Sequence, residues 1–108
     1  MKLILRGDDR LLAQAQKAKA QLQVELALGR FGEEVQTVVL RFSKGAEGAG
    51  QQTQRCQIIV DIKPRRIRVE HTDSDLTVAL ERAADKAARS IARALDEERL
   101  RNHRTVGK

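Results

Sequence analysis

Cysteine, proline and aromatic residues are scarce in this chain of 108 residues, which has one cysteine, one proline, two phenylalanines and no tryptophan or tyrosine. Because Cys56 is the only cysteine, an intramolecular disulfide and a cysteine-rich zinc site are excluded. No segment approaches the roughly 20 apolar residues that span a bilayer, and no early apolar run resembles a signal peptide. We therefore expect a cytoplasmic protein without a membrane partner.

Basic charge, by contrast, is abundant. The 21 lysines and arginines outnumber the 15 acidic residues and give a net charge of +6. The excess lies mainly in residues 63–108, which hold twelve positive and eight negative groups. Such a surplus predicts a polyanionic partner, although a basic protein whose charge only prevents self-association would show it too. The length suits a single domain with one modest core.

The most informative stretch is residues 75–101, which the pattern predicts to be one long helix. Side chains at Thr72, Asp73 and Ser74 can cap its start, and Asp75 suits its first turn. Apolar residues recur at helical spacing along one side: Leu76, Leu80, Ala83, Ala87, Ile91 and Ala94. Basic residues recur along another side: Arg82, Lys86, Arg89 and Arg93. One face is thus suited to burial and another to negative charge.

The rest of the chain predicts one more helix and four strands. We expect strands at 2–6, 36–43, 54–62 and 66–71, a turn at 63–65, and a glycine-bearing hairpin loop at 45–53. The other helix is expected over 10–28, ending at Gly29. Its predicted buried side consists of Leu11, Ala15, Ala18, Leu22 and Leu26. Its predicted outer row consists of Arg10, Gln14, Lys17 and Gln21, and Val24 and Leu28 fall nearer to this row.

The resulting order, β-α-β-β-β-α, predicts an α+β fold in which both helices cover one face of a four-stranded sheet. We expect a single domain over residues 1–101, followed by a basic flexible tail over 102–108. Nothing in this layout indicates a second domain, a linker or a repeat.

Catalytic chemistry has no recognisable constellation in the sequence. His71 and His103 lie far apart and lack partners at metal-ligand spacing, while Cys56 falls among inward apolar positions. We therefore predict no catalytic residue, no metal, no cofactor and no small-molecule substrate. Cys56 and His71 are interpreted as structural residues.

The basic row of the last helix is the candidate binding site. Rows of charge on helices are usually only solvated, but four like charges at contact spacing repel one another and cost folding energy. Such a row suits a phosphate backbone. The lack of aromatic residues argues against base stacking, so we expect contacts with the phosphates and shape of folded RNA. The predicted RNA-binding residues are Arg82, Lys86, Arg89, Arg93, Lys17 and Arg10.

The chain also resembles the family of ribosome hibernation promoting factor and ribosome-associated inhibitor A, formerly called sigma-54 modulation proteins. The second helix of that family opens with Asp-Leu/Met-Tyr-Ala-Ala-Ile-Asp and continues into Asp-Lys-x-x-Arg. Matching residues here are Asp75, Leu76, Ala79, Leu80, Asp85, Lys86 and Arg89. The chain departs from the family pattern at Thr77, which replaces an aromatic residue, and at the acidic segments 8–9 and 96–98.

The resemblance implies a fold like that of double-stranded-RNA-binding domains, and a short family form that is monomeric when free. It implies binding to ribosomal RNA in the decoding channel of the small ribosomal subunit, where the protein blocks messenger and transfer RNA in idle ribosomes during stationary phase or stress. Lys86 and Arg89 take the expectation of RNA contact from the family motif. The alternative is a protein-interaction or transcription-modulating module that binds an acidic protein.

Overall fold

The computed structural model describes residues 1–7, 14–44 and 53–106, and its elements follow the predicted order. The strands are β1 (Lys2–Gly7), β2 (Thr37–Lys44), β3 (Gln54–Asp61) and β4 (Arg66–Asp73). The helices are α1 (Gln14–Leu28), the short 3₁₀ helix η1 (Gly29–Glu34) and the long α2 (Leu76–Val106). The sequence predicted every one of these except η1. Of the loop expected at 45–53, only Thr53 lies among the described residues.

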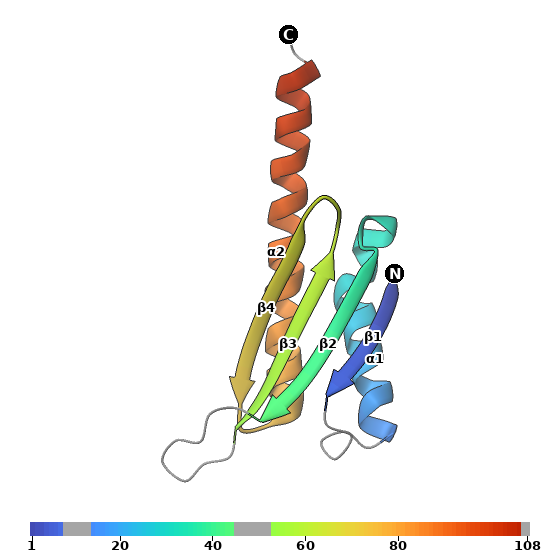
Figure 1. Ribbon diagram of the computed structural model, residues 1–108, viewed down its shortest axis with the longest axis vertical. Helices are drawn as coiled ribbons and strands as arrows, with labels where there is room; N and C mark the ends of the chain where they lie inside the picture. The colour runs from blue at the N-terminus through green and yellow to red at the C-terminus, as the bar shows by residue number, and fades with distance from the viewer. Residues whose placement is uncertain (8–13, 45–52, 107–108) are drawn as a thin grey trace.

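The four strands form one sheet in the order β1-β2-β3-β4. β1 runs parallel to β2, whereas β2, β3 and β4 are antiparallel neighbours. Figure 1 shows α1 and α2 on the same face of this sheet, so the opposite face has no helix over it. The predicted α+β fold is confirmed. No helix within the described ranges is both long enough and apolar enough to cross a membrane.

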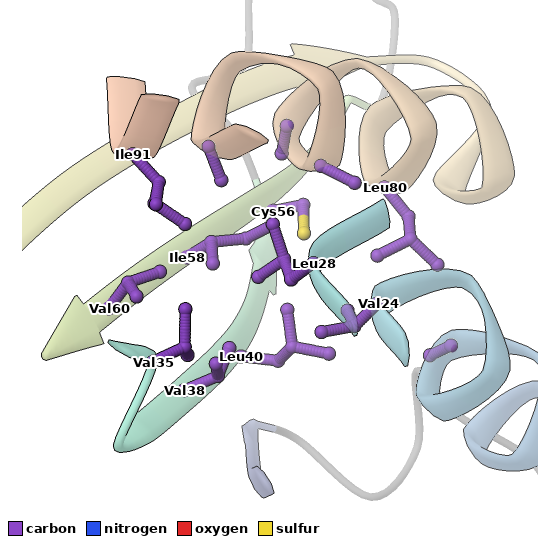
Figure 2. Packing of buried hydrophobic residues seen from close by; sticks show 14 of the residues in the cluster. Val24, Leu28, Val35, Val38, Leu40, Cys56, Ile58, Val60, Leu80 and Ile91 are labelled. Atoms are coloured by element: carbon purple, nitrogen blue, oxygen red, sulfur yellow. The ribbon is translucent and has the colours of Figure 1, made fainter. Parts of the chain in front are cut away.

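The core lies between the sheet and the two helices. The inward side chains of β2 and β3 are fully buried and match the predicted inward faces: Val38, Leu40, Phe42, Cys56, Ile58 and Val60. Ile67 and Val69 of β4 pack at the margin of this core, and Figure 2 shows side chains from both helices directed at those of the sheet. The predicted apolar stripe of α2 is also confirmed, since five of its six residues are buried and Leu76 is half-buried.

The face that α1 buries differs from the prediction. Ala20, Val24 and Leu28 are buried, whereas Leu22 and Leu26 are 55% and 72% exposed. Ala18 is exposed too, and Lys17, expected in the outer row, is half-buried. Because apolar residues occur on nearly every side of α1, their spacing does not select one face. Packing against the sheet and α2 makes the choice. Arg10 and Leu11 lie outside the described residues.

Both ends of α2 also differ from the prediction. Asp75 is the N-cap rather than a first-turn residue, since its Oδ1 accepts a hydrogen bond from the Thr77 N–H at 2.8 Å. Asp73 Oδ1 in turn accepts from the Asp75 N–H at 2.9 Å. At the other end the helix continues to Val106, so residues 102–106, expected as flexible tail, are helical. No glycine or proline interrupts the chain before Gly107. The domain limit at residue 101 stays a prediction.

Candidate nucleic-acid interface

The four basic residues of α2, hereafter the α2 row, line one flank of the helix. At roughly 100° per residue, Arg82, Lys86, Arg89 and Arg93 fall within an arc of about 60°. All four are exposed. Among the described residues, no ion pair joins any of them to a carboxylate. The row is therefore gathered and accessible, as the sequence predicted.

The flank that carries the α2 row is the one beside β4. Lys86 Nζ donates a hydrogen bond to the backbone carbonyl of Glu70 at 3.0 Å. β4 is an edge strand of the sheet, and a lysine over an edge carbonyl satisfies a group that would otherwise lack a partner. Lys86 thus has a structural contact that the other three members of the α2 row lack.

A second contact holds α2 along β4. At the start of the strand, Arg65 donates a hydrogen bond to Glu97 at 2.7 Å. From Lys86 to Glu97 the helix rises roughly 16 Å, and from Glu70 to Arg65 the strand covers about the same length. The helix and strand therefore run side by side over this stretch, and the α2 row follows the β4 edge (Figure 1).

Electrostatics at the upper end of the α2 row involve Glu97. The hydrogen bond from Arg65 lowers the pKa of the Glu97 carboxyl, partial burial opposes this, and the nearby charge of Arg93 lowers it further. Arg93 consequently lies within the field of a carboxylate already engaged by another arginine. It remains exposed and available to a second anion.

The first-helix residues proposed for RNA contact do not join the α2 row. Lys17 is half-buried and already engages another group, and Arg10 lies outside the described residues. α1 packs against the opposite flank of α2, where residues of both helices line a shallow hollow of about 230 Å³. This hollow includes Gln16 and Gln23 of α1 and Thr77 and Glu81 of α2. The described part of α1 therefore contributes no cation to the β4 flank.

Comparison with solved structures identifies the same architecture in two ribosome-related proteins. The N-terminal domain of Protein Y from Thermus thermophilus is 23% identical, with 86% of this chain and 98% of that domain covered at a TM-score of 0.67. A ribosomal subunit interface protein from Coxiella burnetii is 12% identical, with 89% of this chain and 99% of that one covered at a TM-score of 0.67. This chain shares their fold. No family model and no curated protein matches its sequence.

Sequence reasoning missed the role of the β4 edge beside the α2 row. The strand was predicted, but its edge position and its contact with Lys86 depend on strand order and helix packing. One signal was available: a strand joined by a few residues to the following helix forces the two to lie antiparallel and close together. That connection here is Ser74 and Asp75.

The described residues hold no arrangement suited to catalysis or to metal binding. No cluster of three or more histidine, cysteine or acidic side chains with metal-binding geometry occurs among them. Burial raises the pKa of the Cys56 thiol from 9.0 to about 12, so this thiol stays protonated and unreactive at neutral pH. His71 faces the core from β4 as the direct neighbour of Cys56, and His103 lies where side chains are not described.

Proposed function

We propose that this protein is a non-enzymatic ribosome-binding factor that holds ribosomal RNA through the α2 row. The proposed site is the decoding channel of the small subunit, and the proposed effect is to exclude messenger and transfer RNA from idle ribosomes in the cytoplasm. Inhibition would come from occupancy alone, because no bond is made or broken.

The observation that carries this proposal is the state of the α2 row. Arg82, Arg89 and Arg93 are exposed cations without an ion-pair partner among the described residues. Repulsion along the row costs folding energy, and phosphates placed against it would relieve that cost while releasing counterions. Guanidinium groups also match phosphate oxygens in a two-pronged geometry that ammonium groups lack. The shared fold with a ribosomal subunit interface protein supports the choice of partner.

Co-sedimentation with purified small ribosomal subunits tests the proposal. The double variant Arg82→Gln/Arg89→Gln removes two exposed charges that have no contact to lose, so the fold should persist. We expect its affinity to fall roughly tenfold or more at moderate salt. For four phosphate contacts, the wild-type slope of log affinity against log salt should be about −3, and it should be about half as steep in the double variant.

A matched control removes the same charge elsewhere. Lys19 is exposed on α1, and Arg99 is 71% exposed on α2 away from β4. The variant Lys19→Gln/Arg99→Gln should bind nearly as well as wild type. Equal losses in both double variants would show that net charge, rather than the α2 row, governs binding. Association that survives digestion of the RNA would instead favour an acidic protein partner.

A further inference from the structure

The face of the sheet that no helix covers is strongly basic. Its outward residues follow from the strand register and include six cations: Lys2, Arg6, Arg41, Arg55, Arg66 and Arg68. Only two acids share this face, Asp61 and Glu70. Among the described residues, none of these eight side chains forms an ion pair with another. The open face therefore has an uncompensated surplus of four charges, which nothing in the α2 row accounts for.

The register places two of the arginines directly side by side. Arg6 of β1 pairs with Arg41 of β2, and paired residues on neighbouring strands lie about 5 Å apart. Both side chains are exposed. Like charges opposite one another destabilise a sheet, and no described carboxylate separates these two. An anion between them would convert the repulsion into two attractions.

Arg55 adds a third guanidinium to the same end of the sheet. It pairs with Ser43, which lies two residues beyond Arg41 on β2, so Arg55 is a diagonal neighbour of Arg41. The Nε–H of Arg55 is buried and has no acceptor among the described residues. Polar groups left in this state are uncommon in folded proteins. The cluster of Arg6, Arg41 and Arg55 thus combines converging charge with an unused hydrogen-bond donor.

A second group of cations lies at the other end of the open face, where Lys2 and Arg66 occupy the outer strands in one cross-strand row. Four residues separate Lys2 from Arg6, so the two groups lie roughly 13 Å apart along the strands. Between them runs an apolar strip of Ile4, Val39 and Ile59, with no aromatic ring. A small anion cannot reach both groups, whereas a chain of phosphates can. Without rings to stack bases, the contact is with a sugar–phosphate backbone.

We infer that the open sheet face is a second RNA-binding surface, on which Arg6, Arg41 and Arg55 hold phosphates of an RNA segment other than the one on the α2 row. The inference rests on the proposed function, because it gives the same class of partner a second contact. The β4 edge separates the two surfaces, which face in different directions. The protein is therefore held between two RNA segments rather than lying on one.

The test compares Arg6→Gln/Arg41→Gln with the α2-row variant Arg82→Gln/Arg89→Gln and with the control Lys19→Gln/Arg99→Gln. The probes are purified small ribosomal subunits and a short RNA duplex at low salt. We expect the sheet variant to lose roughly tenfold or more in affinity for subunits, with a salt slope shallower by about 1.4. Wild type should bind two duplexes per chain by native mass spectrometry, and each binding variant only one. Thermal stability of the sheet variant should be unchanged or higher, because a like-charge pair is removed.

The two claims fail separately. Normal subunit binding and two bound duplexes in the sheet variant, with a loss only in the α2-row variant, would overturn the inference and leave the proposed function intact. A loss only in the sheet variant would support the open face and overturn the α2 row as the site. A loss in the sheet variant that persists after RNA digestion would mean an acidic protein partner and would overturn the inference.

Discussion

The Cys56 thiol lies fully buried in β3, where burial raises its pKa from 9.0 to about 12. The native protein therefore keeps the thiol proton in a range of pH where the unfolded chain has released it. Because unfolding then releases a proton, the free energy of unfolding should fall as pH rises above 9. Below that pH both states hold the proton and the thiol contributes no pH dependence.

This residue-scale prediction is measurable as a difference in slope. Between pH 9 and about 11, wild type should lose up to about 1.4 kcal/mol of stability per pH unit more than Cys56→Ala. Urea unfolding at several pH values gives both slopes, and the variant subtracts the contribution of lysines and other groups. Parallel slopes in the two proteins would show that the buried thiol is not the group responsible.

Lys86 and Arg89 occupy the same row but differ in what they already contact. Lys86 donates to the Glu70 carbonyl, whereas Arg89 has no such contact. Lys86→Gln should therefore cost roughly 0.5–1 kcal/mol of stability, and Arg89→Gln should cost almost none. RNA affinity should fall more in Arg89→Gln, because Lys86 must share or give up a bond to contact phosphate. Chemical denaturation and filter binding measure the two effects, and the reverse ranking in both assays would contradict this assignment.

Among the elements, α1 offers a direct test of which face is buried. Leu28 is 1% exposed and Leu26 is 72% exposed. The same substitution at the two positions should have very different costs: about 2–5 kcal/mol for Leu28→Ala and less than about 0.5 kcal/mol for Leu26→Ala. Urea midpoints supply both values. A larger cost at Leu26 would restore the face that the sequence pattern favoured.

The start of α2 depends on the cap at Asp75. Its carboxylate accepts the Thr77 N–H, so Asp75→Ala leaves that donor without a side-chain acceptor and should cost about 0.5–2 kcal/mol. Asp75→Asn keeps an acceptor oxygen and serves as the matched control, with a cost of only a few tenths of a kcal/mol. Thermal or urea unfolding distinguishes them. If both variants lost the same stability, the negative charge near the helix dipole would matter more than the hydrogen bond.

At the scale of the whole molecule, the long axis is set by α2. The protein measures 59 × 29 × 17 Å, and Figure 1 shows the C-terminal part of α2 extending beyond the sheet. The last buried residue of this helix is Ala94, with Leu95 half-buried beside it. Residues beyond this point add length without adding to the core, apart from the link between Glu97 and Arg65.

Truncation tests where the folding unit ends. A chain ending at Arg101 keeps every buried residue and the Glu97 contact, so its unfolding midpoint should stay within roughly 4 °C of wild type. A chain ending at Ser90 lacks Ile91 and Ala94 and should not fold to a stable state. Calorimetry measures both. A large loss on ending the chain at Arg101 would place residues 102–108 inside the domain.

The order of elements, the inward strand faces and the buried stripe of α2 were all readable from the sequence. Each depends on periodicity along a single element, which is a local property: two residues for a strand and 3.6 for a helix. The α2 row was readable for the same reason, because its four members share one helix.

Tertiary structure decided what local periodicity could not. α1 has apolar residues on most of its sides, so its docking chose the buried face, and Lys17 was drawn away from the role expected of it. Strand order placed β4 at the edge beside the α2 row and brought Arg6 of the first strand against Arg41. These contacts join residues distant in the chain, and their energies arise only when the elements pack together. The sequence by itself determined which cations exist on each element, and the packing of the elements determined which cations meet.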